Sequence, residues 1–347
     1  MRTVIIGKVQ CRGNAKPAWP SRSQARRQGL FFSSFAPRNQ ALGQAHILPA
    51  LMKQPRRQFL KSSAALTAGV VLLPDAFAAK KARQPRYQIG LSQYSLRAMF
   101  KDGSLDPLDY PAFSVDQFGI NQLDLWEGGL PKDKLDDTNY LKQLKRRAKK
   151  AKAELFLLMT GALDANLQKR DASLKQILPS LSRAQILGCE FVRVFLRAPG
   201  SDEAAGVAAS VEALKPLSDA AAEKNVVIAI EPGASQLSQR GGFLAKVAKK
   251  LNHPACKLMP DFGKLRNNVY DGTEAMMPYT ATISCKMHSF DDKGNQPDFD
   301  YTRLMKIIDK AGYRGILAIE WEGHKLKPVP GVKASKKLIE ASLESLA

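Results

Sequence analysis

The chain has 347 residues, 44% hydrophobic and 24% charged, so it can bury a large core, and this composition excludes wholesale disorder. Its formal net charge is +21, which on its own would suggest a nucleic-acid partner. The charge is uneven, however: residues 1–51 carry +8, residues 52–80 carry +4, and residues 81–347 keep +9, partly on basic stretches such as Lys142–Lys152 that are typical of solvated helix faces. We therefore predict no nucleic-acid partner.

The first segment, residues 1–51, is basic, contains no Asp or Glu and has no hydrophobic periodicity. It ends just before a second methionine, Met52. We interpret residues 1–51 as a misassigned extension and Met52 as the true start of the protein. A peptide from residues 1–51 in the precursor would contradict this interpretation.

Residues 52–78 have the order of a secretory signal: a basic region, a mild apolar stretch from Ala64 to Leu73, and the small-residue pattern of Ala76 to Ala78. The stretch is too short to span a bilayer, which takes about 20 residues. The pair Arg56-Arg57, followed by Phe-Leu-Lys, resembles a twin-arginine export signal, although Pro55 departs from the usual pattern. We expect the twin-arginine machinery to export the protein to the periplasm, with no membrane span left after processing.

Three cysteines follow the signal, Cys189, Cys256 and Cys285, without CxxC spacing. An odd number without that spacing predicts neither a disulfide framework nor a zinc knuckle.

From residue 86 onward, short apolar runs alternate with longer amphipathic ones, which predicts parallel strands joined by helices. The predicted strands are Gln88–Gln93, Gln122–Trp126, Glu154–Met159, Phe191–Leu196, Val226–Glu231, Lys257–Asp261, Thr282–His288 and Gly315–Glu320. The predicted helices are Tyr140–Lys152, Ala172–Leu187, Gly206–Lys224, Gly242–Leu251 and Tyr301–Ala311.

Eight such units over residues 79–347 match the size of a (β/α)8 TIM barrel, typically about 250 residues. An open doubly wound sheet is the alternative, but it usually carries a glycine-rich loop after its first strand. The sequence there is YSLRAMF, without glycine, so the barrel is favoured.

The last four predicted strands each end at or near a residue that can bind a metal ion. These residues are Glu231, Asp261, His288 and Glu320. Strand alternation places Ala229 below Glu231, and Lys286 below His288, on one face. Catalytic groups of a barrel lie at the carboxyl ends of its strands. Three carboxylates and one imidazole suit Mn²⁺, Mg²⁺ or Co²⁺ better than Zn²⁺, so we predict one divalent metal ion.

Val226–Gly323 resembles the sugar phosphate isomerase/epimerase superfamily, also called xylose isomerase-like TIM barrels, and the resemblance extends more weakly over residues 86–347. Its most specific motifs are PDFG at 260–263 and IEWEG at 319–323. The pattern is similar to ketose 3-epimerases, hydroxypyruvate isomerases and exported relatives. The resemblance implies that the four residues hold one metal ion, and that Glu231 and Glu320 exchange a proton beside a sugar carbonyl through an enediolate. Members often pair through outer helices, so a homo-oligomer is also expected.

Other side chains near the strand ends are candidates for binding a small sugar substrate. Lys264 departs from the His or Asn of many relatives, and Lys286 faces inward; each could stabilise an enolate, grip an anion or support a carboxylate. Trp126 and Tyr94 could form an apolar surface against a sugar ring. Arg193 or Arg197 could reach the open end of the barrel. The alternative for Trp126 and Tyr94 is ordinary packing, and the alternative for the two arginines is an ion pair with an outer helix.

Three other functions stay open at this point. A metal-dependent lyase or dehydratase on a keto-sugar or keto-glycoside would begin with the same proton abstraction. A non-catalytic sugar-binding barrel would give no hydrogen exchange. An AP endonuclease-like nuclease needs a histidine-rich metal cluster, and residues 79–347 contain only His253, His288 and His324.

Overall fold

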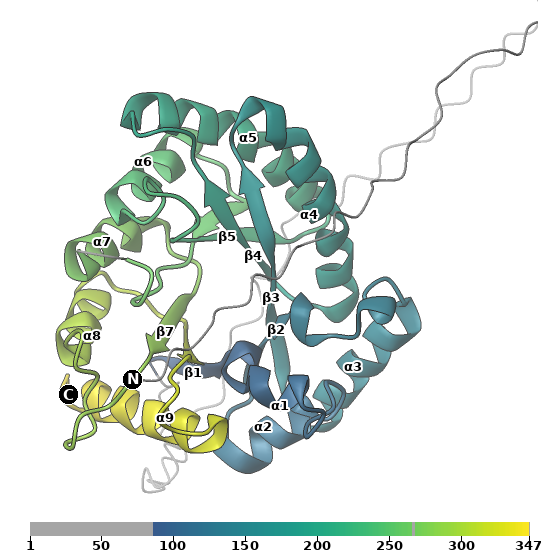
Figure 1. Ribbon diagram of the computed structural model, residues 1–347, viewed down its shortest axis with the longest axis vertical. Coiled ribbons are helices and arrows are strands. Elements are labelled where there is room, and N and C mark those ends of the chain that lie inside the picture. The colour runs from purple at the N-terminus through teal and green to yellow at the C-terminus, as the bar shows by residue number, and fades with distance from the viewer. Residues whose placement is uncertain (1–85, 266–267, 347) are drawn as a thin grey trace, which may run out of the picture. The chain divides into compact units, whose positions relative to one another are not determined.

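The computed structural model describes residues 86–265 and 268–346, which form a ring of parallel strands inside a ring of helices (Figure 1). The strands are β1 (Gln88–Leu91), β2 (Gln122–Trp126), β3 (Glu154–Asp164), β4 (Phe191–Arg197), β5 (Val227–Glu231), β6 (Cys256–Leu258), β7 (Ile283–Met287) and β8 (Ile316–Trp321). The helices are α1 (Arg97–Lys101), α2 (Tyr110–Phe118), α3 (Thr138–Lys150), α4 (Leu167–Leu187), α5 (Glu203–Glu223), α6 (Gly241–Leu251), α7 (Val269–Met276), α8 (Tyr301–Lys310) and α9 (Pro328–Glu344).

The eight strands pair in the order β6-β5-β4-β3-β2-β1-β8-β7, all parallel. Between β6 and β7 the sheet continues through parallel bridges that join Leu258 to Thr280 and Asp261 to Ser284. Pro260 interrupts the regular strand there because proline has no N–H, yet its carbonyl accepts the Ser284 N–H at 2.9 Å. These bridges bring the two ends of the sheet together, and the predicted (β/α)8 barrel is confirmed.

The five predicted helices are confirmed as α3, α4, α5, α6 and α8. Helix α4 ends where predicted, at Gly188, whose φ of 85° is the left-handed conformation that glycine adopts readily. Sequence reasoning missed α1, α2, α7 and α9. The helices α2 and α9 both carry proline in the first turn, where a missing N–H costs little.

Apolar side chains form two layers, one outside the ring of strands and one inside it. The larger one lies between the strands and the outer helices. The smaller one fills the barrel interior; its fully buried members include Met159, Ala229, Met259 and Ala318. Ala229 and Ala318 each lie two residues before a predicted site glutamate. Because side chains alternate along a strand, those glutamates face the same interior, one layer higher.

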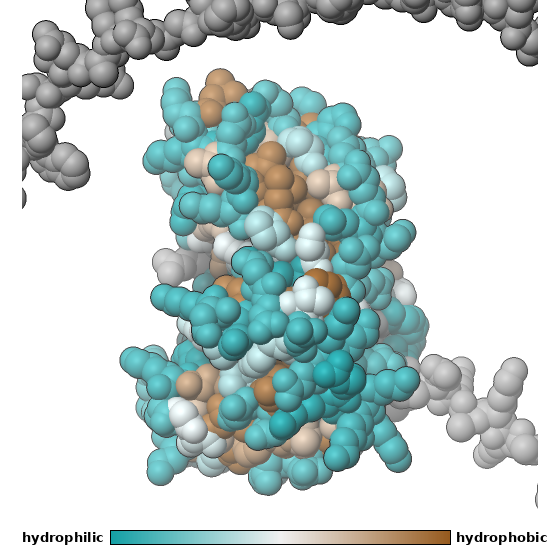
Figure 2. All heavy atoms as spheres, turned by 90° about the vertical axis from the view of Figure 1, so that its right-hand side faces the viewer, coloured by the Kyte–Doolittle hydropathy of each residue, from teal (hydrophilic) through white to brown (hydrophobic). Residues whose placement is uncertain are grey.

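The surface at the right of Figure 1 is mainly hydrophilic, with small separate hydrophobic patches (Figure 2). Among the described residues, none of the helices has the length and apolar character needed to cross a membrane. The predicted extension, 1–51, and the predicted signal, 52–78, lie outside the described residues.

Candidate active site

A cavity of about 370 Å³ opens at the carboxyl ends of the strands. Six predicted site residues line it: Trp126, Arg193, Glu231, Lys264, Lys286 and Glu320. They come from distant parts of the sequence, and the barrel brings them to one end. This gathering is what the pattern of polar residues at successive strand ends predicted.

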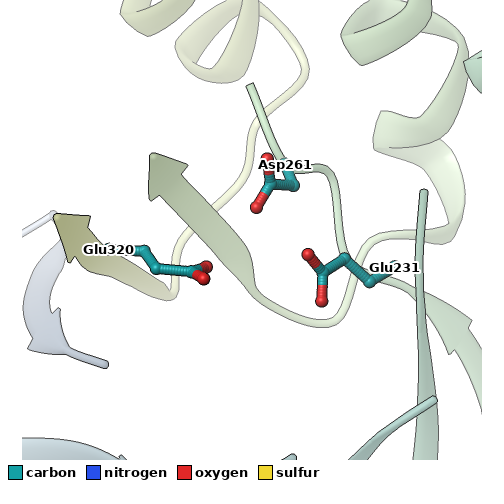
Figure 3. A group of neighbouring side chains, drawn as sticks. All are labelled: Glu231, Asp261 and Glu320. Atoms are coloured by element: carbon teal, nitrogen blue, oxygen red, sulfur yellow. The ribbon is translucent and has the colours of Figure 1, made fainter. Parts of the chain in front are cut away.

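Three carboxylates form a buried group at this end of the barrel. One oxygen from each of Glu231, Asp261 and Glu320 lies within 4.8 Å of the other two. All three side chains point toward a shared space between β5, β8 and the segment that follows β6 (Figure 3). Carboxylates this close and this buried repel one another unless a cation or a proton compensates.

The Lys286 ammonium lies inside this group. Its Nζ is 2.8 Å from Glu320 Oε1, 2.7 Å from Glu322 Oε1 and 3.4 Å from Asp261 Oδ2. The Lys286 side chain is 1% exposed, so these carboxylates replace the water that an ammonium would otherwise bind.

Gly263 leaves room for the Lys286 side chain to reach the group. A Cβ at Gly263 would lie 2.6 Å from Lys286 Cδ and 3.0 Å from His288 Nε2. The PDFG turn that carries Asp261 thus needs glycine as its fourth residue, because the lysine stem passes directly against it.

A second buried cation flanks the opposite side of the group. Arg193 Nε lies 2.8 Å from Glu231 Oε2, and its Nη1 donates to the carbonyl of Thr160 at 2.7 Å. The guanidinium also lies over the Phe195 ring, 4.2 Å from its centre. Arg193 is therefore fixed within the site rather than paired with an outer helix.

The two glutamates have opposite pKa shifts. Burial raises the pKa of Glu231 well above its ordinary value, and Arg193 opposes this only in part. Burial also acts to raise the pKa of Glu320, but the charge and hydrogen bond of Lys286, with a hydrogen bond from Ser284, lower it to about 2. Glu231 thus favours its protonated form and Glu320 its carboxylate, although both are glutamates at strand ends.

Asp261 and Lys286 follow the same physics. Burial raises the pKa of Asp261, with Lys286 opposing it. Burial acts to lower the pKa of Lys286, but Asp261, Glu320 and the other carboxylates raise it well above the ordinary value. Lys286 therefore keeps its positive charge.

His288, the fourth predicted ligand, does not belong to the carboxylate group. It is half-buried and lies one residue beyond the end of β7, with its ring beside Gly263. The structure thus brings three of the four predicted ligands together.

Sequence reasoning missed two acidic residues of this end of the barrel. Glu322 binds Lys286, and it lies two residues after Glu320, so alternation could have found it. Asp124 is fully buried on β2, two residues before Trp126, and accepts the Gln93 N–H at 2.8 Å. Burial raises the Asp124 pKa to about 8.

The remaining predicted residues lie at the rim. Trp126 is half-buried and packs edge-on against Tyr94, with ring centres 4.9 Å apart. Lys264 Nζ is 5.6 Å from the centre of the Phe195 ring. Arg197 also lines the cavity.

A second and larger cavity, of about 1050 Å³, adjoins the first through Tyr94 and Trp126, which line both. Its wall includes Trp321, and it carries basic side chains from Arg97 and Lys327. The rings of Tyr94 and Trp126 thus lie between the smaller cavity, which contains the carboxylates, and the larger one beside it.

The carboxylate group could hold a metal ion: its three oxygens are close together, and Asp261 Oδ2 accepts no hydrogen bond. A divalent ion would, however, lie beside the Lys286 ammonium. Two unit charges about 4 Å apart interact by roughly 4 kcal/mol at an effective dielectric constant of about 20, and a divalent ion doubles this repulsion. A divalent ion at this group would therefore be attracted by the three carboxylates and repelled by the Lys286 ammonium. The preference for Mn²⁺, Mg²⁺ or Co²⁺ stays a prediction.

Comparison with known proteins identifies the family of the fold. The family model for xylose isomerase-like TIM barrels matches residues 115–347. The C-glycoside deglycosidase alpha subunit of Arthrobacter globiformis is 33% identical over 75 residues, which cover 20% of this chain and 21% of that protein.

The solved structures of similar fold include two of low sequence identity. A 3-keto-D-glucoside 4-epimerase from E. coli has a TM-score of 0.53 and 13% identity, covering 74% of this chain and 99% of that one. An IolI protein with a bound zinc atom has a TM-score of 0.60 and 12% identity, covering 74% and 98%. These likenesses concern the fold.

Proposed function

Because the chain belongs to the xylose isomerase-like TIM barrel family, we propose that it is a sugar isomerase or epimerase that removes a proton next to a carbonyl. The observation that carries the proposal is the pair Glu231 and Glu320, whose oxygens lie within 4.8 Å of each other in the wall of the cavity. The sugar epimerase among the structural neighbours supports the same class of reaction.

The first step requires a base, an acid and a positive charge near the sugar carbonyl. Glu231 and Glu320 are the candidate acid and base, because two neighbouring carboxyl groups that share one proton offer one group to take a proton and one to supply it. As the C–H bond breaks, its electron pair forms the C=C bond of an enediolate and negative charge moves to the carbonyl oxygen. Return of a proton at the neighbouring carbon gives an isomer, and return to the opposite face gives an epimer.

Substrate binding follows from the cavity wall. Trp126 and Tyr94 offer apolar faces to the C–H groups of a sugar ring. Lys264 and Arg193 offer donors to its oxygens. A volume of about 370 Å³ is of the size that binds a small molecule such as one sugar.

The experiment is a screen of keto-sugars in D₂O with the purified chain, read as deuterium at the carbon next to the carbonyl. We expect exchange with at least one sugar, and its loss in the Glu231→Gln variant. A sugar that binds without exchange in the parent protein would support the non-catalytic sugar-binding alternative instead.

A lyase acting on a keto-glycoside is the second candidate, and the adjoining cavity of about 1050 Å³ favours it. A glycoside needs space for a leaving group beside the reacting ring, on the far side of Tyr94 and Trp126. The short match to the C-glycoside deglycosidase alpha subunit supports the same idea. Release of the aglycone from a keto-glycoside, followed by chromatography, separates a lyase from an epimerase, which keeps the glycosidic bond.

We also propose that residues 52–78 direct twin-arginine export. The test replaces Arg56 and Arg57 with lysine in the full chain, and follows the protein by immunoblot in cytoplasmic and periplasmic fractions. We expect the parent in the periplasm and the double variant in the cytoplasm. Equal periplasmic amounts would contradict export by this route.

A further inference from the structure

The position of Lys286 raises the question of which cation this site uses. Its Nζ lies 2.7 to 3.4 Å from carboxylate oxygens of Glu322, Glu320 and Asp261. The ammonium donates hydrogen bonds to Glu320 and Glu322, and Asp261 lies 3.4 Å away as a third carboxylate. The lysine thus stands where a bound cation would be expected.

The backbone of Lys286 is also fixed by hydrogen bonds and strand pairing. Lys286 lies within β7, opposite Glu320 in the register with β8, and its carbonyl accepts the Tyr301 hydroxyl at 2.9 Å. The hydroxyl of Ser284, two residues earlier on the same strand, donates to the other oxygen of Glu320 at 2.7 Å. Neighbouring strands therefore aim the lysine and the glutamate at each other.

Protein cations already lie against these carboxylates. Lys286 Nζ contacts Glu320, Glu322 and Asp261, and Arg193 Nε lies 2.8 Å from Glu231 Oε2. Glycine at position 263 leaves the space that the lysine stem fills. A divalent ion bound to these oxygens would have to lie beside the Lys286 ammonium, which already contacts two of the three carboxylates.

We propose that the Lys286 ammonium is the resident cation of this site, and that the site binds no divalent metal ion while that ammonium is present. The inference rests on the proposed function for its chemical role. There, the ammonium donates a hydrogen bond to the oxygen that becomes negative in the enediolate. Glu322, whose side chain is 21% exposed, is the partner that a sugar oxygen would displace. No electron transfer and no further reactant is required.

The test compares Mn²⁺ binding by the parent chain, the Lys286→Met variant and a control variant, Lys264→Met. Methionine keeps much of the length of lysine without the charge, and the control removes one charge from the same cavity but outside the carboxylate group. Isothermal titration and elemental analysis after gel filtration measure binding. We expect no stoichiometric Mn²⁺ in the parent or control, and about one Mn²⁺ per chain in Lys286→Met, bound on the order of a hundredfold more tightly.

Stoichiometric Mn²⁺ in the parent would overturn the proposal, and so would a folded Lys286→Met variant that binds none. If Lys286→Met does not fold, the parent still decides: its melting temperature should be equal with EDTA and with excess Mn²⁺, and a rise with Mn²⁺ would contradict the proposal. Absence of deuterium exchange in the parent is a separate failure. It would contradict the proposed function and leave the metal-binding result standing.

Discussion

Two layers of the barrel interior differ by only two residues along each strand. The lower layer contains Ala229, Met259 and Ala318, which are packed apolar side chains. The layer above contains Glu231, Asp261 and Glu320, which are carboxylates just as buried. The same strands thus supply close packing below and concentrated charge above. The comparison teaches that the lower layer stabilises the fold, whereas the upper layer gives up stability for chemistry.

The largest expected effect comes from an isosteric change in the upper layer. Glu231→Gln removes a group that can exchange a proton but keeps its size. We expect proton exchange with the active sugar to fall about a thousandfold, within the range typical of general acid–base groups. The melting temperature should change little, because the amide has nearly the size of the protonated acid and is likewise uncharged. A rate within a few-fold of the parent, measured by deuterium uptake, would remove Glu231 from the reaction.

The opposite result is expected in the lower layer. Met259→Ala leaves a cavity under the site, and we expect it to lower the free energy of unfolding by about 2–5 kcal/mol. Urea denaturation measures this loss. The exchange rate per folded molecule should stay near that of the parent, because Met259 does not line the cavity. If activity fell while stability stayed, the division between the layers would be wrong.

The sequence predicts the division itself well, because alternation along a strand needs no knowledge of partners. It correctly places Ala229 under Glu231 and brings six predicted side chains to one cavity. Beyond the end of a strand the backbone is no longer regularly extended, so alternation no longer predicts where a side chain points. His288 lies one residue beyond β7, and its ring packs beside Gly263 instead of joining the carboxylates.

The pairing of charges could not be predicted from the pattern alone. Lys286 was expected to face inward, but which carboxylates it would bind depends on strand register and on the space beside Gly263. Asp124 was hidden for another reason: it lies in an apolar run, QLDLW, and a shift of register between Leu123 and Asp124 accompanies it.

Asp124 provides a smaller effect that depends on pH. Its pKa is raised from 3.8 to about 8 by burial, so the folded state holds a proton that the unfolded state releases above pH 4. The free energy of unfolding should therefore fall as pH rises from about 4 to about 8, at most by about 1.4 kcal/mol per unit. Asp124→Asn should remove this dependence, since an amide oxygen can still accept the Gln93 N–H.

The measurement is the difference in melting temperature between Asp124→Asn and the parent at pH 5 and pH 8. We expect a larger advantage of the variant at pH 8. Equal differences at both pH values would mean that Asp124 is ionised in the fold. Asp102→Asn serves as the control, since Asp102 lies on the surface and its pKa is lowered by hydrogen bonds from Ser104.

The smallest effect is expected at the rim, where neither layer is involved. Trp126 is half-buried, and its edge-on contact with Tyr94 is of the kind worth about 0.5–1.5 kcal/mol. Trp126→Ala removes this contact and also the aromatic face that Trp126 offers to the cavity, and should raise KM several-fold for a sugar that stacks on the ring, with kcat much less affected. Trp126→Phe should recover most of the binding, because an aromatic face remains. A fall in kcat with unchanged KM would mean that the ring orients the reacting carbon rather than simply walling it, and the rim would then belong functionally with the carboxylate layer.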